Sequence, residues 1–374
     1  TSDYIVEGKI DGVFNYAGTL TELQNFSTTL FDNSTTDINA KLIDFKITPP
    51  TYSPYDISNL NGKIICNNRN MQLDSISGSI KGIPFNLSGN ASNMLPYLLF
   101  DGESATCNLQ LNIEKINVNP FMEHYDKYIS SESTSTGSLI TKVKFTTQEL
   151  IYDNYVLRDL TCNLDLLESE TIISNTSFKT LQGSYSGNTK LTYLPNTNIR
   201  CEGTGEIKKM SAKELFHTFN NFDQTFLTEN KINGKLTAKF SFSLLFDKNY
   251  NPIFSSLKII TDVIAEDGTI KDFDPFIEMG KKMKVQEFKN VTFAKIQNTI
   301  KIENDTLYIP NMEIKTNAFE MNFAGKHAIT NNNFNYSLTI FLKKTLSNMF
   351  KKGNNVEDFG EIEQNTDGNI KIPV

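Results

Sequence analysis

Side chains that commonly carry out catalysis or bind metals are few and scattered in this chain of 374 residues. The three histidines, His124, His217 and His327, lie far apart in the sequence, and none has the spacing to a carboxylate that metal sites use. The sequence has no serine-hydrolase elbow, no glycine-rich nucleotide-binding loop and no zinc-protease motif. We interpret the histidines as surface or helix-face residues and predict a protein that is not an enzyme and uses no metal or cofactor.

Four cysteines occur, and none forms the Cys-x-x-Cys pair of a zinc or redox site. Cys66, Cys107, Cys162 and Cys201 each lie two residues from an aliphatic side chain in a strand-like run. We therefore expect four small apolar residues on strand faces. A disulfide in an oxidising compartment stays open as an alternative, because the sequence alone cannot pair them.

The charge balance is acidic, with 36 basic and 43 acidic residues and a formal net charge of −7. Nucleic-acid backbones are bound by clustered Lys and Arg, so this balance argues against a nucleic-acid partner. The carboxylates are spread along polar faces, where solvation explains them. The pair Asp272 and Asp274 suits the positive end of a helix.

Alternation of apolar and polar residues is the dominant pattern, and it is typical of strands with one buried face. It is clearest in residues 107–114, 236–246, 319–325 and 334–342. Clean alternation predicts antiparallel sheet, since buried parallel strands are apolar throughout. Asn and Gly tolerate positive φ, so groups of these residues predict hairpin turns between the strands. The predicted turns are Asn61-Gly62, Asn67-Asn68, Lys81-Gly82, Ser88-Gly89-Asn90, Ser186-Gly187-Asn188, Asn233-Gly234, Asp267-Gly268 and Asn331 to Asn333.

The predicted helices are few and short, at residues 119–128, 211–219, 274–283 and 343–351. In the second, Ser211 is a capping residue, Glu214 completes a capping box, and the residues that follow form an apolar stripe. In the third, Asp274 caps the helix and Pro275 suits its first position. The Ser/Thr-rich stretch 130–137 is expected to be a connector.

Helices this short cannot cover the apolar strand faces, and apolar area left in water costs about 25 cal/mol per Å². The sheet must therefore pack on a second sheet, close on itself or leave an apolar concave face for a ligand. The pattern alone favours a sandwich or curled sheet with an ordinary core, with an apolar groove second. A weak repeat, whose units end in aromatic-x-apolar-x-Gly or a near variant, indicates an extended array. Its copies end at residues 85–89, 183–187 and 319–325.

The most specific strings in the chain lie between residues 231 and 350. They are Gly234-Lys235-Leu236-Thr237-Ala238, Asp267-Gly268-Thr269-Ile270, Phe273-Asp274-Pro275, Phe288-Lys289-Asn290-Val291-Thr292-Phe293 and Leu307-Tyr308-Ile309-Pro310-Asn311. Together they resemble the C-terminal region of the AsmA-like family in the versions found in Bacteroidota, which fits the abundance of Lys, Asn and Ile. These motifs are structural, and none carries a catalytic residue.

The resemblance implies a protein anchored in the inner membrane by one N-terminal helix, with a long β-structure in the periplasm. It implies a mainly β fold, an elongated, curled antiparallel sheet of the repeating β-groove type with a few short helices. We divide the chain into a β-repeat segment at 1–136, a middle β-repeat segment at 137–230 and an AsmA-like β-module at 231–374. No run approaches the ~18 apolar residues of a membrane span, and no signal peptide is present. We expect a soluble piece of a longer protein, without the anchor.

AsmA-like proteins are similar to bridge-like lipid transfer proteins, so the apolar strand faces become the candidate working surface. The implied partners are phospholipid or other lipid acyl chains, and envelope or outer-membrane proteins, in outer-membrane lipid homeostasis and assembly. Short helices such as 211–219 are expected to cap or plug the groove. The residues expected to line the groove or its packed end are Leu109, Leu111, Phe240, Phe242, Leu244, Leu338 and Ile340.

Two other functions stay open on the sequence. One is a structural or assembly module for outer-membrane biogenesis that acts by protein–protein contacts without a lipid ligand. The other is a carbohydrate-binding or adhesin-like β-protein, against which the absence of Trp counts.

Overall fold

The structure is a computed structural model, and it describes residues 5–19, 27–49, 56–122, 137–195, 198–223, 225, 227–283, 285–329, 333–342, 363–364 and 370–373. The fold is mainly β, with 70% strand and 12% helix, and its curled antiparallel sheet does not close on itself. The predicted fold class is therefore confirmed. The chain divides into two compact units, unit 1 (Thr1–Phe178 with Asn188–Leu194) and unit 2 (Lys179–Gly187 with Pro195–Val374).

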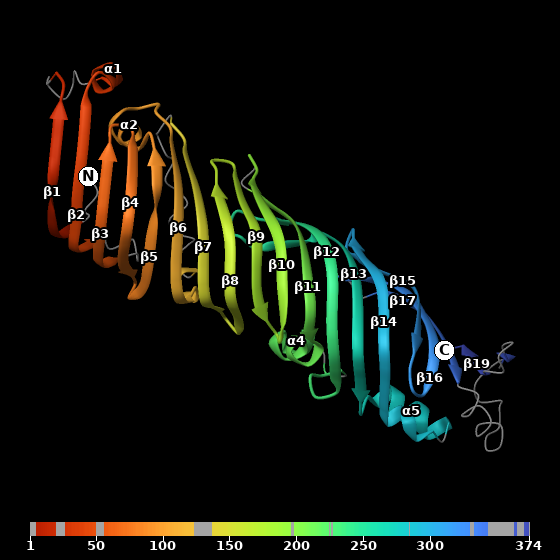
Figure 1. The fold of residues 1–374 in the computed structure, drawn as a ribbon. Coiled ribbons are helices and arrows are strands. Elements are labelled where there is room, and N and C mark those ends of the chain that lie inside the picture. The colour runs from red at the N-terminus through yellow and green to blue at the C-terminus, as the bar shows by residue number, and fades with distance from the viewer. Residues whose placement is uncertain are drawn as a thin grey trace. The chain divides into compact units, whose positions relative to one another are not determined.

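Unit 1 is a sheet in which neighbouring strands follow the order of the chain (Figure 1). Strands β1 to β8 pair antiparallel, except that β6 and β7 run parallel. A parallel pair needs a long crossover, and the chain leaves β6 through α3 before it reaches β7. The strands are β1 (Ile5–Ala17), β2 (Thr35–Thr48), β3 (Ile57–Asn67), β4 (Asn70–Ile80), β5 (Ile83–Ser92), β6 (Ala105–Asn117), β7 (Leu139–Tyr152), β8 (Tyr155–Leu166) and β9 (Glu170–Thr180). The helices are α1 (Thr28–Asp32), α2 (Met94–Leu99) and α3 (Asn119–Met122).

Unit 2 continues the same construction, with antiparallel pairs from β11 to β17 and a last pair between β17 and β19. Its strands are β11 (Ile199–Ser211), β12 (Ile232–Phe246), β13 (Pro252–Lys271), β14 (Asn290–Glu303), β15 (Thr306–Lys315), β16 (Phe319–Ala328), β17 (Phe334–Leu342), β18 (Glu363–Gln364) and β19 (Ile370–Pro373). Its helices are α4 (Ala212–Thr218), the 3-10 turn η3 (Asn220–Asp223), α5 (Asp274–Met283) and the 3-10 turn η4 (Gln286–Lys289). The boundary between the units runs through β9 and β10 (Gly183–Tyr193).

The predicted turns are correct where the Asn- and Gly-containing group lies between two strands. They are wrong where the group lies inside a strand. Lys81 and Gly82 connect β4 to β5 with φ of 50° and 76°, as a tight hairpin requires. By contrast, Asn61-Gly62 lies inside β3, where a Cβ on Gly62 would be 2.8 Å from the Cα of Ile76. The groups at 88–90, 186–188, 233–234 and 267–268 likewise lie inside β5, β10, β12 and β13. Within these strands, Gly187 and Gly268 make room for neighbouring atoms, and Gly62, Gly89 and Gly234 also have positive φ of 146°, 153° and 136°, which residues with a side chain rarely adopt. Residues 331–332 lie outside the described residues.

The predicted helices were confirmed in place where the structure describes them. α5 has the predicted bounds, and the Ser211 side chain caps α4 by accepting a hydrogen bond from the Glu214 amide at 3.3 Å. The capping box is incomplete, because the Glu214 carboxylate accepts from the Gln182 amide group at 3.3 Å and the Ser211 amide donates to the Leu181 carbonyl at 2.8 Å. Residues 123–128 and 343–351 lie outside the described residues.

A packed core lies in the C-terminal part of unit 2, between α5, η4 and the strands near them. The Phe288 and Phe319 rings stack with centroids 5.3 Å apart, and the Phe276 ring meets Phe319 edge-on at 5.4 Å. Phe319 has 0% of its surface exposed. The buried residues of this core are Val285, Phe288, Val291, Ala318, Phe319 and Ile340. The fold of this end therefore depends on a closed cluster of side chains.

We predict that Phe319→Ala lowers the free energy of unfolding of unit 2 by about 3–5 kcal/mol, because it removes a ring from a filled core. Urea unfolding followed by circular dichroism measures this. The matched control is Phe254→Ala on β13, where the ring is 65% exposed and the loss should be within about 0.5 kcal/mol. Equal losses in the two variants would contradict the assignment of the core.

Candidate functional site

The sheet of unit 1 has one apolar face, and the strand register defines it. Residues directly opposite each other on neighbouring strands project to the same face. Three cross-strand rows gather the apolar side chains in this way. They are Ile38–Cys66–Met71–Ala91–Cys107, Ala40–Ile64–Leu73–Gly89–Leu109–Val143–Leu164 and Ile76–Leu87–Leu111–Phe145–Cys162. Apolar side chains from seven strands, β2 to β8, thus form one continuous surface, which we call the apolar face of unit 1.

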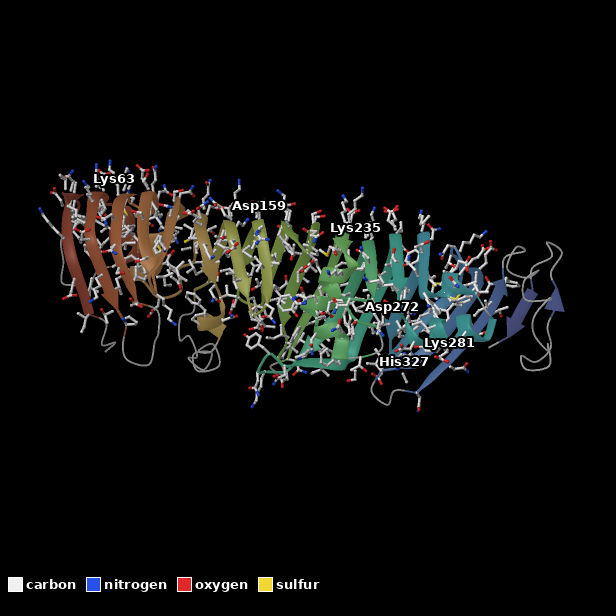
Figure 2. The ribbon with its side chains drawn as sticks, turned by 90° about the horizontal axis from the view of Figure 1, so that it is seen from below. Lys63, Asp159, Lys235, Asp272, Lys281 and His327 are labelled. Atoms are coloured by element: carbon white, nitrogen blue, oxygen red, sulfur yellow. The ribbon has the colours of Figure 1, made fainter. Side chains whose placement is uncertain are left out.

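The opposite face of unit 1 is polar, and its side chains bond to one another. The Asn67 amide donates to Asp37 at 2.9 Å, and the Asn112 amide donates to the Thr146 hydroxyl at 2.8 Å. Figure 2 shows Lys63 and Asp159 of this unit with their charged ends projecting outward from the sheet. This face is therefore the hydrated one, and the apolar face is the side that needs a cover.

The structure describes no second layer over the apolar face. Strands β3 to β8 contact their neighbours in the sheet, and α2 contacts β4 and β6 at one end. Leu109 and Leu111 are consequently only half-buried. Part of the apolar surface of both side chains therefore stays accessible to a ligand.

Unit 2 has an apolar face of the same kind on β11 to β14. Gly203–Phe242–Ile259–Ile302, Gly205–Phe240–Thr261–Ile300 and Ile207–Ala238–Val263 are cross-strand rows. Leu244 lies beside Cys201 on the same side. Within the described residues, β12 makes its main contacts with β11, β13 and helix α4, and the Tyr185 ring of β10 lies beside Phe240. We call this surface the apolar face of unit 2.

The structure separates the seven residues predicted to line a groove. Leu109 and Leu111 lie half-buried on the apolar face of unit 1. Phe240, Phe242 and Leu244 lie half-buried on that of unit 2. Ile340 is 1% exposed inside the packed core, so no ligand reaches it there. Leu338 is in β17, and its side chain lies outside the described part of the chain.

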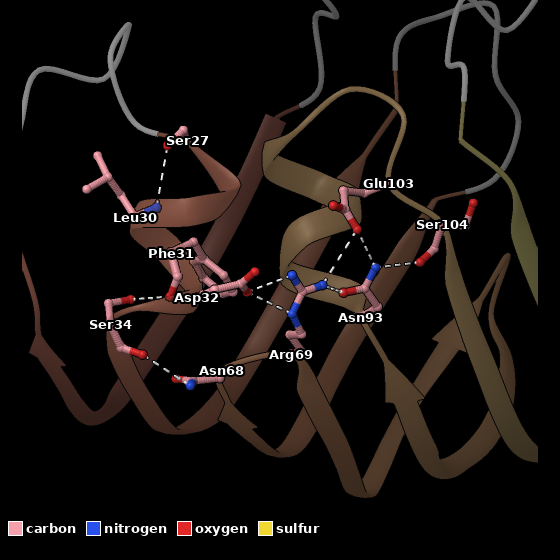
Figure 3. Close-up of polar contacts among 10 residues, drawn as sticks. All are labelled: Ser27, Leu30, Phe31, Asp32, Ser34, Asn68, Arg69, Asn93, Glu103 and Ser104. Atoms are coloured by element: carbon pink, nitrogen blue, oxygen red, sulfur yellow. Dashed lines mark hydrogen bonds and ion pairs between the residues drawn. The ribbon is translucent and has the colours of Figure 1, made fainter.

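Two short helices that the sequence did not reveal close one end of the strands in unit 1. Figure 3 shows α1 and α2 on either side of Arg69, in the turn between β3 and β4. The guanidinium donates from Nε and Nη2 to Asp32 at 3.0 and 2.6 Å and lies 3.6 Å from Glu103. Asn93, in left-handed conformation, accepts from Arg69 and donates to Glu103 at 2.8 Å.

These bonds hold α1 and α2 over buried side chains at the strand ends. The Phe31 and Phe100 rings meet edge-on at 5.9 Å, and Pro96 is almost completely covered. Phe31 also packs here with 3% of its surface exposed. The signal that could have located this cap is Arg69 itself, one of only three arginines in the chain.

The cysteines are free thiols on the apolar faces, which agrees with the sequence interpretation. Cys66 and Cys107 are in the same cross-strand row but three strands apart, roughly 14 Å, beyond the ~7 Å between Cα atoms that a disulfide can span. Burial raises the pKa of the Cys66, Cys107 and Cys162 thiols. Burial, with the nearby Glu202 carboxylate, also raises the pKa of Cys201.

No cluster of His, Cys, Asp or Glu suited to a metal ion occurs among the described residues. His217 is exposed on α4, and His327 Nδ1 lies 2.9 Å from the Tyr336 hydroxyl. His124 lies outside the described residues. Nor do the described helices include one with the length and apolarity to span a membrane.

Two shallow hollows lie along β4 to β9, and their linings include Leu109 and Val143 in one and Leu87 and Leu111 in the other. Their lining includes Asn108, Gln110, Lys142, Lys144 and Asn163, and no aromatic side chain among the described residues takes part. A carbohydrate-binding surface would be expected to offer an aromatic platform. These hollows therefore give the carbohydrate interpretation no support.

Comparison with known proteins yields no match to a family model, a curated protein or a solved structure. The resemblance to AsmA-like proteins stays a prediction from the sequence strings. The functional argument rests on the two apolar faces.

We predict that the native protein reacts slowly with a thiol reagent at pH 8 and that all four thiols react in guanidinium chloride without a reductant. The raised pKa keeps these thiols protonated, so less thiolate is present than in a free cysteine. Titration with Ellman's reagent measures both states. Fewer than four thiols after denaturation would reveal a disulfide and contradict the strand spacing.

We predict that Arg69→Gln loosens α1 and α2 without unfolding the sheet. Bonds to charged groups contribute ~1.5–3 kcal/mol, and the 37% exposure of the Arg69 side chain reduces this to about 1 kcal/mol. Hydrogen exchange at the Met94 and Phe100 amides should therefore accelerate about fivefold. Arg158→Gln, which removes an exposed ion pair with Glu149, should leave those amides unchanged. Unchanged exchange in Arg69→Gln would show that the cap does not depend on this network.

Proposed function

We propose that this chain is the periplasmic part of an AsmA-like protein that binds or conducts lipid acyl chains along its apolar faces. The observation that carries the proposal is a set of continuous apolar rows with no second layer over them among the described residues. In an ordinary β-sandwich, a second sheet would bury such rows. In this proposal a hydrocarbon ligand covers them instead, and the protein serves outer-membrane lipid homeostasis and assembly.

The proposed mechanism is passive, with no covalent step. Acyl chains lie on the apolar face while the headgroup stays in water. Each buried methylene contributes about 0.8 kcal/mol, so ten give about 8 kcal/mol before the cost of ordering the chain. An apolar surface offers no hydrogen-bonding groups along its length. An acyl chain can therefore shift from one cross-strand row to the next without breaking hydrogen bonds. This suits conduction as well as binding.

The main alternative is an assembly module that pairs strands with a partner protein, and the edge strand β1 favours it. β1 pairs with β2, and its side chains are exposed almost throughout. Ile10, Val13 and Phe14 are each at least 60% exposed. Unpaired backbone groups on such a strand invite another strand. An edge contact and a lipid-binding face use different atoms, so the two functions can be tested separately.

The experiment is native mass spectrometry with lipid extraction on the purified chain, combined with a photo-crosslinking residue at position 109 or 240. We expect copurified phospholipid, and crosslinks to lipid from both positions in membranes. Leu111→Lys places a charge on the apolar face and should reduce bound lipid at least fivefold. The matched control, Gln110→Lys, places the same charge on the opposite face of the same strand and should leave bound lipid unchanged.

Absence of copurified lipid together with absence of lipid crosslinks would contradict the proposal. An equal loss of lipid in Leu111→Lys and Gln110→Lys would point to a general charge effect and would also contradict the role of the apolar face. Circular dichroism of both variants controls for folding.

A further inference from the structure

Glycines inside the strands of unit 2 lie under aromatic rings. In β11, Gly203 and Gly205 are opposite Phe242 and Phe240 of β12. A Cβ built on Gly205 would lie 2.6 Å from Cζ of Phe240 and 2.9 Å from Cε2 of Tyr185. Carbon atoms in contact prefer about 3.5–4.0 Å. Both rings therefore occupy the space that any side chain at position 205 would need.

The rings of Tyr185, Phe240 and Phe242 together form a surface that we call the aromatic floor. The Tyr185 and Phe240 centroids are 6.4 Å apart, and those of Phe240 and Phe242 are 6.2 Å apart. All three side chains are half-buried. The tip of the Phe240 ring reaches from β12 to β11. The ring therefore lies along the surface of the sheet and does not project away from it. One side of the floor rests on glycine backbone and the other is open.

Backbone conformation does not explain the glycine at position 205. Its φ lies outside the left-handed range, in contrast to Gly234 of β12 at +136°. A residue with a side chain can adopt this backbone, so only the rings oppose it. The same arrangement recurs in unit 2, where a Cβ on Gly268 would meet the Phe293 ring and one on Gly325 would meet the Tyr336 ring. Of the glycines that end the sequence repeat, Gly325 has this role, whereas a Cβ on Gly89 would meet the Asn108 carbonyl oxygen of the neighbouring strand.

We propose that Gly205 sets the depth of the apolar face by letting the Tyr185 and Phe240 rings lie low, which leaves room above them for a hydrocarbon chain. This inference rests on the proposed function and adds a positioning residue to it. A larger residue at position 205 would displace the two rings into the space that the hydrocarbon chain of the ligand would occupy. The neighbouring rows, Phe242–Ile259 and Ala238–Val263, are apolar as well, so an aliphatic chain fits this surface better than a sugar or a peptide backbone.

The test is a fluorescence titration of the intact chain with cis-parinaric acid, a fatty acid that fluoresces when buried. Gly205→Val should bind it at least tenfold more weakly than the wild-type protein. Thr204→Val, the adjacent residue on the opposite face of β11, is the matched control and should bind normally.

The outcomes separate this inference from the proposed function. If the wild-type chain fails to bind the fatty acid, the proposed function is overturned and this inference with it. If the wild-type chain binds and a folded Gly205→Val binds equally well, the role of Gly205 is overturned while the proposed function stands. If Gly205→Val does not fold, Gly205→Ala replaces it, and normal binding by that variant overturns the inference.

Discussion

The feature on which the rest of this protein depends is one-sided burial in a sheet one layer thick. Each strand offers an apolar row to one side and a polar row to the other, and hydrogen bonding along the sheet satisfies the backbone. Nothing in that bonding covers the apolar side. The half-buried state of Leu109 and Phe240 follows directly, and the cost of such exposure in water is the physical reason to expect a hydrocarbon ligand.

The covered parts of the molecule are built differently from the open ones. In unit 2, Phe288 and Phe319 are buried in a core against which Phe276 and Met279 of α5 pack. In unit 1, α1 and α2 close the strand ends over Phe31, held by the bonds of Arg69 (Figure 3). On the apolar face of unit 2, Gly205 leaves space that the Phe240 and Tyr185 rings occupy. Closed and open regions therefore serve stability and binding respectively in this proposal.

Glycine has two distinct uses in this chain. In Lys81-Gly82 it supplies the positive φ of a hairpin turn. At Gly205 and Gly268 it supplies the absence of a side chain beneath a ring. The sequence presents both as a small residue between strand-like runs. Only the register of the neighbouring strand shows which use applies, since the ring that fills the space comes from that strand.

The sequence by itself determined the fold class, most strands, the place of α4 and α5, and the placing of the cysteines as small apolar residues on strand faces. Period-two alternation and capping residues are local, so they can be read along the chain. Tertiary structure alone decided that no second layer covers the apolar side within the described residues, that β6 and β7 pair in parallel, and that Ile340 is core while Leu109 is half-buried. Those outcomes depend on which strands become neighbours and on which elements cover them. The residues of a single strand determine neither its neighbours nor its cover.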